Sequence, residues 1–153
     1  MYTYPKSAYI HIPFCHRRCF YCDFAVVPIG DNIDSLNGNK SDTVKDYLTY
    51  LKKEILSIKH KSPLSTIYIG GGTPSILDPT QIADLINIFR KFYGIDRGAE
   101  ITMEVDPASF DEYSLNGFIN AGINRFSLGA QSFNDEILKK SGRRHTKDDV
   151  FNS

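Results

Sequence analysis

Short runs of β-branched and aromatic residues alternate along this chain with longer stretches in which hydrophobic side chains recur every three or four positions. The short runs predict four strands, over residues 8–12, 66–69, 101–105 and 125–128. The longer stretches predict helices, because this spacing gathers hydrophobic side chains on one helical face. Alternating strands and helices are typical of βαβ units around a parallel sheet, so we expect an α/β fold.

Capping signals delimit the predicted helices. Ser41 and Asp42 precede the first helix, and Asp78 can cap the second. Pro79 then occupies the first helical position and Gln81 the position that a capping box requires. Gly94 is placed to end this helix. Three further helices are predicted at residues 111–121, after residue 132 or 134, and from about residue 146.

Composition restricts the class of protein. Hydrophobic residues make up 41% and charged residues 24% of the 153 residues, a globular balance. Basic and acidic residues both number 18, so no net charge favours nucleic acid or an anionic membrane. The sequence has no apolar run long enough for stable membrane insertion and no secretory signal at its start, so we expect a cytoplasmic protein.

Residues 28–40 (PIGDNIDSLNGNK) are rich in Gly, Asn and Asp, which predicts an exposed loop and not a domain linker. The length suits one domain. Four strands would leave an open parallel sheet with a bare edge, a poor stand-alone arrangement. We therefore expect residues 1–153 to be a fragment of a longer protein.

The three cysteines, Cys15, Cys19 and Cys22, form a CxxxCxxC motif directly after the first predicted strand. An odd number of clustered cysteines argues against a disulfide framework and indicates soft-metal ligation or redox chemistry. An iron–sulfur cubane normally takes four thiolates, so three would leave one iron with an open coordination position. A loop at the carboxyl end of a strand is where α/β barrels carry their chemistry.

Two other interpretations of these cysteines remain open. Zinc could bind the three thiolates together with His11 or His16 as a Cys₃His site. Structural zinc sites usually pair one ligand knuckle with a distant second pair, which this sequence lacks. The cysteines could also be free buried thiols.

Five sequence blocks carry a family resemblance: YIHIPFC, CFYCDF, GGGTPS, EVDP and SLGAQSF. In this order they resemble the conserved blocks of radical S-adenosylmethionine (SAM) proteins similar to oxygen-independent coproporphyrinogen III oxidase. The resemblance runs from Tyr9 to about His145. It implies the N-terminal portion of a partial (β/α)6 TIM-like barrel, with about four βα units in residues 1–153. It also implies a 4Fe–4S cluster on the three cysteines and SAM chelating the open iron.

The resemblance further assigns cofactor contacts to Tyr9, Tyr21, Gly71, Gly72, Thr73, Glu104, Gln131 and Arg143. Each has a simpler interpretation. The glycines could form a tight turn, and Glu104 could form a structural salt bridge. Gln131 could be an ordinary loop residue. The tyrosines could merely pack. Arg143 could end a solvated helix, and its neighbour Arg144 leaves the register open. No side chain is predicted to be catalytic.

Two functions fit the resemblance. One is oxidative decarboxylation of coproporphyrinogen III, an oxidoreductase reaction of porphyrin biosynthesis. The other is a heme chaperone that delivers heme to client proteins. The oxidases resemble CxxxCxxCxC, whereas Phe24 occupies the fourth cysteine position here, which favours the chaperone. Expected partners are heme or a porphyrin and an electron donor such as flavodoxin or ferredoxin. The sequence does not decide whether the protein forms a homodimer or whether it is an enzyme.

Overall fold

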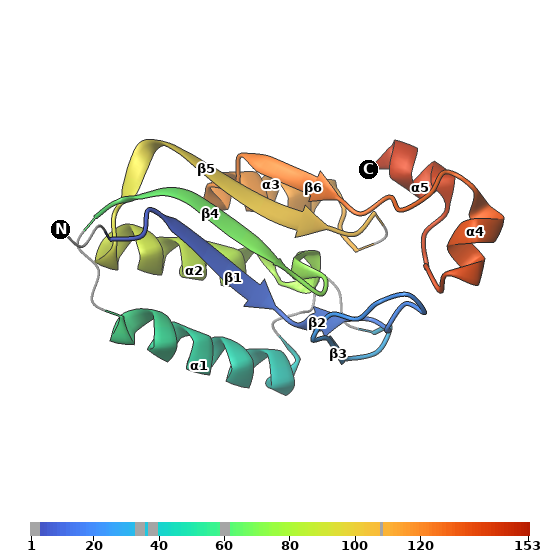
Figure 1. Cartoon of the computed structure of the whole chain (residues 1–153), viewed down its shortest axis with the longest axis horizontal. Coiled ribbons are helices and arrows are strands. Elements are labelled where there is room, and N and C mark those ends of the chain that lie inside the picture. Colours follow the sequence, from blue (N-terminus) through green and yellow to red (C-terminus); the bar gives the residue numbers. More distant parts are fainter. Residues whose placement is uncertain (1–3, 33–35, 37–39, 59–61, 108) are drawn as a thin grey trace.

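A computed structural model describes residues 4–32, 36, 40–58, 62–107 and 109–153. Four parallel strands form the main sheet in chain order: β1 (Ser7–Ile12), β4 (Leu64–Gly71), β5 (Ile95–Val105) and β6 (Arg125–Leu128) (Figure 1). The α/β prediction is confirmed. Consecutive parallel strands need crossover connections, and helices supply them.

The strand register aligns the carboxyl ends of all four strands. Ile12 pairs with Gly71, Ile69 with Met103, and Val105 with Leu128. The loops that follow these strands therefore meet at one edge of the sheet. Each of the predicted motifs, from the cysteines to Gln131, lies in or beside one of these loops.

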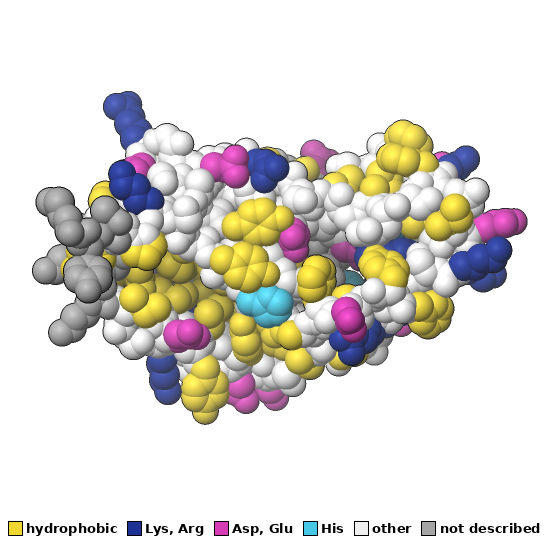
Figure 2. All heavy atoms as spheres, in the orientation of Figure 1, with side chains coloured by type: hydrophobic (Ala, Val, Ile, Leu, Met, Phe, Trp, Pro, Cys, Tyr) yellow, Lys and Arg dark blue, Asp and Glu magenta, His cyan; other side chains and the backbone are white. Residues whose placement is uncertain are grey.

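Three helices cover one face of the sheet: α1 (Asp42–Ser57), α2 (Pro79–Phe92) and α3 (Glu112–Ala121) (Figure 1). The core between them includes Ile10, Ile12, Ile67, Ile69, Met103, Leu48, Ile82, Ile86 and Phe118, all nearly inaccessible to solvent. The opposite face is open in the described chain, and Tyr9 on it is 61% exposed. Figure 2 shows hydrophobic side chains gathered on this open face beside a histidine.

The predicted caps are present. Asp78 and Gln81 form the capping box of α2, and Gly94 follows this helix with φ 81°. Asp111 accepts a hydrogen bond from the Ser114 amide at the start of α3. The short helices η2 (Pro74–Ile76), α4 (Asp135–Lys140) and α5 (Lys147–Asn152) complete the helical elements of the described residues.

Two features differ from the sequence prediction. A small parallel ladder joins β2 (Phe14–Cys15) to β3 (Val27–Pro28), and β5 begins at Ile95 instead of residue 101. The predicted loop over 28–40 lies partly outside the described residues, and residues 30–32, 36 and 40 in it are exposed. Among the helices that the structure describes, none combines the length and apolarity required to cross a membrane.

Candidate functional site

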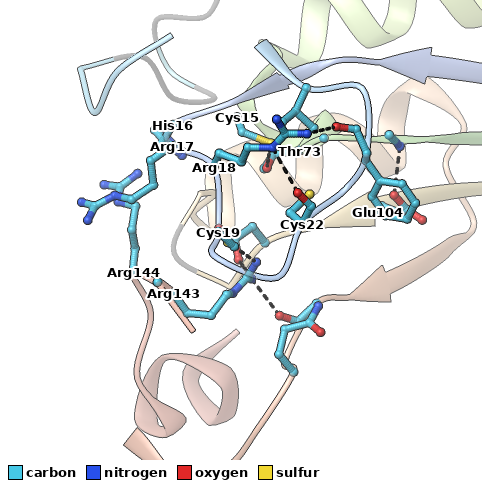
Figure 3. Close-up of a pocket in the computed structure, with 18 of the residues that line it drawn as sticks. Cys15, His16, Arg17, Arg18, Cys19, Cys22, Thr73, Glu104, Arg143 and Arg144 are labelled. Carbon is cyan, nitrogen blue, oxygen red and sulfur yellow. Dashed lines mark hydrogen bonds and ion pairs between the residues drawn. The ribbon is translucent and has the colours of Figure 1, made fainter. Parts of the chain in front are cut away.

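A cavity of about 550 Å³ lies at the carboxyl edge of the sheet (Figure 3). All the sequence-predicted site residues except Tyr9 line it, namely Cys15, Cys19, Cys22, Tyr21, Gly71, Gly72, Thr73, Glu104, Gln131 and Arg143. The parallel register explains this convergence, because the loops after β1, β4, β5 and β6 meet here.

The cluster loop, residues 15–22, is folded by its own backbone and by one arginine. The Cys22 amide donates to the Cys19 carbonyl at 3.1 Å. Arg18 donates to the carbonyls of Cys22, at 3.1 Å, and Phe24, at 2.8 Å. Arg18 therefore closes the turn that presents the three thiols, none of which forms a disulfide.

Two of the thiols have polar neighbours from other loops. Thr73 Oγ1 donates to Cys15 Sγ at 3.5 Å, and Arg143 Nη1 donates to Cys19 Sγ at 3.7 Å. Burial raises the pKa of the Cys15 thiol, and the hydrogen bond from Thr73 opposes this rise. In the described chain, no three His, Cys, Asp or Glu side chains are arranged to hold a single metal ion. A cubane cluster makes a different demand, because each thiolate binds a separate iron.

The glycine run at the end of β4 permits a close approach of the cluster loop. A Cβ on Gly72 would lie 2.8 Å from Cys15 Sγ and 2.6 Å from the Phe14 carbonyl oxygen. Gly71 has φ 123°, a conformation that side chains disfavour. The glycines therefore accommodate the chain's own cluster loop, in addition to any ligand in the cavity.

Glu104 faces the cavity from β5 and is held by two donors. Tyr68 donates its hydroxyl to Oε1 at 2.7 Å, and the Gly71 amide donates to Oε2 at 3.1 Å. Among the described residues Glu104 forms no salt bridge, so it differs from the structural ion pair considered above. Its carboxylate is oriented by neutral groups.

Tyr9 lies outside the cavity, on the open face of the sheet. Its ring stacks on that of Tyr68 with centroids 6.0 Å apart, and its hydroxyl lies 3.1 Å from His11 Nδ1. Burial, and next the charge of Glu104, raise the pKa of Tyr9. His11 Nε2 in turn lies 3.0 Å from the Ala25 carbonyl. Tyr9 is thus linked to the cavity through Tyr68 and Glu104, and through His11 to the segment after the cluster loop.

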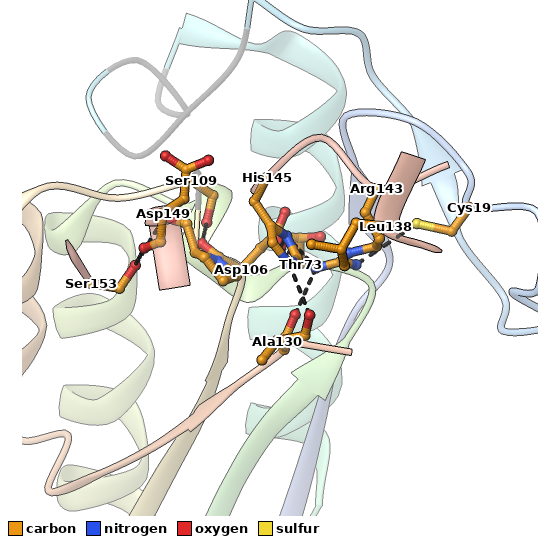
Figure 4. Close-up of polar contacts among 12 residues, drawn as sticks. Cys19, Thr73, Asp106, Ser109, Ala130, Leu138, Arg143, His145, Asp149 and Ser153 are labelled. Atoms are coloured by element: carbon orange, nitrogen blue, oxygen red, sulfur yellow. Dashed lines mark hydrogen bonds and ion pairs between the residues drawn. The ribbon is translucent and has the colours of Figure 1, made fainter. Parts of the chain in front are cut away.

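Arg143 is largely buried beside the cluster loop, with its side chain 12% exposed. Nη2 donates to the Gly129 carbonyl at 2.9 Å and forms a short ion pair with Asp106 (Figure 4). Burial opposes ionisation, but Asp106 raises the pKa of Arg143 above its usual value, so the guanidinium stays charged. Arg144 pairs instead with Asp31 near the surface, at 3.4 Å.

Gln131 and Tyr21 complete the predicted contacts. Gln131 follows β6 and has φ 63°, a left-handed conformation that is uncommon for a residue other than glycine. Burial raises the pKa of Tyr21, as does the neighbouring Cys19 thiol, while the charge of Arg143 opposes the rise. The Tyr21 ring thus adjoins both Cys19 and Arg143.

Several residues of the site were absent from the sequence prediction. Tyr68, Ser75, Asp106 and His145 contact or support the cavity residues. Ser75 and Asp106 lie within the blocks GGGTPS and EVDP, so the motifs contained them without revealing their role. The contact between Asp106 and Arg143 spans 37 positions of sequence.

The residues of this cavity fit an iron–sulfur cluster and a nucleotide-like ligand. Three thiols on one loop match a cluster that takes three thiolates. Arg143 Nε is buried and has no hydrogen-bond partner among the described residues, so an acceptor in the cavity would satisfy it. The cavity also has room for a ligand beside the thiols.

Comparison with known proteins agrees with this geometry. The heme chaperone HemW of Synechocystis sp. (strain ATCC 27184 / PCC 6803 / Kazusa) is 43% identical over 150 residues, covering 97% of this chain and 35% of the relative. HemW of Escherichia coli (strain K12) is 38% identical over 143 residues, covering 92% of this chain and 36% of the relative. Coproporphyrinogen III oxidase (HemN) from Escherichia coli, a solved radical SAM enzyme, aligns with a TM-score of 0.80 and 32% identity, over 97% of this chain and 33% of that structure.

This chain spans about a third of the length of the curated relatives that it matches. The model of the radical SAM superfamily matches residues 9–153, which include the cluster loop, the glycine run and Arg143. The chain therefore belongs to the radical SAM superfamily.

Proposed function

We propose that this chain is the cluster- and SAM-binding part of a heme chaperone, a protein that binds heme and delivers it to clients. One observation carries the proposal: three thiols, a glycine run and a largely buried arginine from separate segments of the chain line one cavity. The relatives named above as heme chaperones extend over nearly all of this chain.

Each residue group has a distinct role in the proposed site. Cys15, Cys19 and Cys22 would bind three irons of a 4Fe–4S cluster. Gly71, Gly72 and Thr73 would line the amino-acid end of SAM. Bound together, cluster and SAM supply one-electron chemistry. Tyr21 would shield the cluster from water, since its ring adjoins Cys19 and Arg143.

The polar residues would orient SAM. Glu104, oriented by Tyr68 and the Gly71 amide, has acceptor capacity for hydroxyl or amino groups. Gln131 can donate and accept, and Arg143 can donate to a carboxylate. We propose a more distant role for Tyr9, which would support Glu104 through Tyr68.

Phe24 favours the chaperone over the oxidase. It occupies the position of the fourth cysteine in the oxidase motif, and this residue, 68% exposed, lines the cavity. A phenyl ring cannot replace a thiol as acid, nucleophile or ligand. One observation supports the alternative function, oxygen-independent coproporphyrinogen III oxidase: the structural likeness of this chain to HemN.

We further propose that residues 1–153 are the N-terminal portion of a longer radical SAM core that works in the cytoplasm. Heme or a porphyrin would bind with the help of residues outside this chain. A flavodoxin- or ferredoxin-like donor would reduce the cluster. The bare edge of β6 would pair with a further strand.

The decisive experiment uses the full-length product of the gene, reconstituted anaerobically with iron and sulfide. Hemin and coproporphyrinogen III are added separately, each with SAM and a reductant. Stable, stoichiometric heme binding without vinyl product is the expected result. Conversion of propionates to vinyl groups by the wild-type protein would overturn the chaperone assignment, and Phe24→Cys tests whether the fourth thiol confers such turnover.

A further inference from the structure

We propose that Asp106 is a positioning residue: it holds Arg143, and with it residues 141–145, against the cluster loop. The inference rests on the proposed cluster and SAM site and deepens it. Asp106 is absent from the cofactor contacts implied by the family resemblance. Its role follows from three sets of contacts, on its backbone, on its carboxylate and on the far side of Arg143.

The backbone of Asp106 is fixed by two buried serines. Its amide donates to Ser75 Oγ at 3.0 Å, and its carbonyl accepts from Ser109 Oγ at 2.8 Å and from the Ser109 amide at 2.9 Å. The two hydroxyls also hydrogen-bond to each other, and the residues are 0% and 2% exposed. The Asp106 side chain therefore projects from a backbone that is held in place.

The carboxylate of Asp106 contacts the Arg143 guanidinium in a nearly dry setting. Their side chains are 15% and 12% exposed, and Gly129 supplies a second acceptor for Nη2 at 2.9 Å. Removing one partner of such a pair leaves an uncompensated buried charge, which is strongly unfavourable. Arg143 thus depends on Asp106 to remain where it is.

His145 completes the surroundings of this ion pair. Its Nε2 lies 2.9 Å from the Ala130 carbonyl, which can only accept, so Nε2 carries the hydrogen. His145 Nδ1 lies 3.3 Å from Arg143 Nη2 and 3.4 Å from Asp106 Oδ1, so the imidazole packs against both members of the pair. The two hydrogens of Nη2 are directed to acceptors in the loops after β5 and β6, which restricts the guanidinium to one orientation (Figure 4).

On its far side Arg143 reaches the cluster loop together with its neighbours in sequence. Nη1 donates to Cys19 Sγ at 3.7 Å, and the Phe20 amide donates to the Ser141 carbonyl at 3.0 Å. A Cβ on Gly142 would lie 3.4 Å from the Phe20 nitrogen, so this glycine lets the two loops pack closely. Asp106 therefore stabilises the contact between residues 141–145 and the cluster loop.

The pair formed by Arg144 and Asp31 offers a matched comparison. It also joins this segment to the cluster loop, because Asp31 pairs with Arg17 as well, at 3.2 Å. Asp31 is 53% exposed, and exposed ion pairs contribute little to stability. Asp31→Asn is therefore a suitable control for Asp106→Asn.

The first test measures amide hydrogen exchange in the full-length protein before cluster reconstitution. In Asp106→Asn we expect exchange of the Phe20 amide to rise at least tenfold, while amides of β4 keep their protection. Asp31→Asn should leave both unchanged. Unaltered exchange at Phe20 in Asp106→Asn would overturn the proposal, and this result does not depend on cluster or SAM.

The second test measures the SAM dissociation constant of the reconstituted protein. Asp106→Asn should weaken SAM binding by about 10–100-fold, the usual effect of losing an outer support of a metal site. In an Arg143→Met background the same substitution should have no further effect, since the two residues act as one unit. Additive losses would contradict the positioning role.

Asp106→Glu keeps the proposal testable if Asp106→Asn does not fold. The longer side chain retains the charge but displaces the guanidinium, so faster Phe20 exchange and weaker SAM binding are expected in a folded protein. Wild-type behaviour of this variant in both measurements would refute the proposal. If the wild-type protein binds no SAM, the proposed function fails, whereas the exchange result still decides the role of Asp106.

Discussion

The hydroxyl of Tyr68, on strand β4, donates a hydrogen bond of 2.7 Å to Oε1 of Glu104 on the adjacent strand β5. The Gly71 amide occupies the other carboxylate oxygen at 3.1 Å. The hydrogen bond to Glu104 is the main reason that the pKa of Tyr68 lies above its ordinary value. Glu104 is therefore oriented before any ligand enters the cavity.

Replacing Tyr68 with Phe should weaken SAM binding. A hydrogen bond to a charged group contributes about 1.5–3 kcal/mol, so the dissociation constant should rise about tenfold or more. Calorimetric titration of SAM into reconstituted Tyr68→Phe and wild-type protein measures this change. Tyr50→Phe, on the exposed surface of α1, is the control. Equal SAM affinity in Tyr68→Phe and wild-type protein would show that Glu104 needs no support from Tyr68.

The three cysteines should be required for iron, and the histidines should not. Cys15→Ala, Cys19→Ala and Cys22→Ala should each reduce bound iron and sulfide to background and abolish the brown colour. His11→Asn and His16→Asn remove the fourth ligand of the alternative Cys₃His zinc site and should retain iron. Elemental analysis of anaerobically purified protein distinguishes the two metals. Zinc that is lost in a histidine variant would support the alternative site.

The helix boundaries followed from the sequence because their signals are local. Asp78, Pro79 and Gln81 lie within four positions and make their contacts with one another and with adjacent amides. The ladder of β2 with β3 could not be predicted, since strands of two residues carry no periodicity. The start of β5 was hidden for a similar reason: Asp96, Arg97 and Gly98 are exposed and disfavour strands by composition.

The candidate site was only partly accessible to sequence reasoning. The motifs located Glu104 and Arg143, but nothing local to either residue indicates Tyr68 or Asp106 as its partner. A solvated helix end was a reasonable interpretation of Arg143 for the same reason. The residues that bury Arg143 belong to loops more than ten positions away in sequence. Contacts between distant segments depend on strand order and register, which no short motif encodes.

Gly72→Ala should disturb the cluster loop more than the fold. The added Cβ would lie under 3.0 Å from backbone oxygens of Pro13 and Phe14 and from Cys15 Sγ, so this loop must move. We expect reduced iron content and a loss of about 1–3 kcal/mol in unfolding free energy. Gly98→Ala is the control, since a Cβ there meets nothing within 4 Å. Full iron occupancy in Gly72→Ala would contradict the close packing described here.

Acid should weaken the cap of helix α3. Hydrogen bonds from the Ser114 amide, and next from its hydroxyl, lower the pKa of Asp111. A lowered folded pKa contributes stability that is present above the unfolded value, about 3.9, and is lost as pH falls through the folded value. Asp111→Ala should cost about 1 kcal/mol at neutral pH.

Urea unfolding at neutral pH and near pH 3 checks this prediction. Asp111→Ser keeps a capping hydroxyl without the charge, so it should retain most of the stability at neutral pH and lose the acid dependence that the wild-type carboxylate contributes. An identical acid response in wild type and Asp111→Ser would exclude Asp111 as its source.

The left-handed backbone at Gln131 sets the stability of the fold against ligand recognition. An L-residue held at φ 63° is disfavoured by about 1–2 kcal/mol, a strain that a single change to glycine would relieve. The chain therefore carries a side chain at a position where glycine would strain the backbone less. Gln131→Gly should accordingly yield a protein with a higher free energy of unfolding and a weaker affinity for SAM. In this loop, conformational stability and ligand recognition therefore oppose each other.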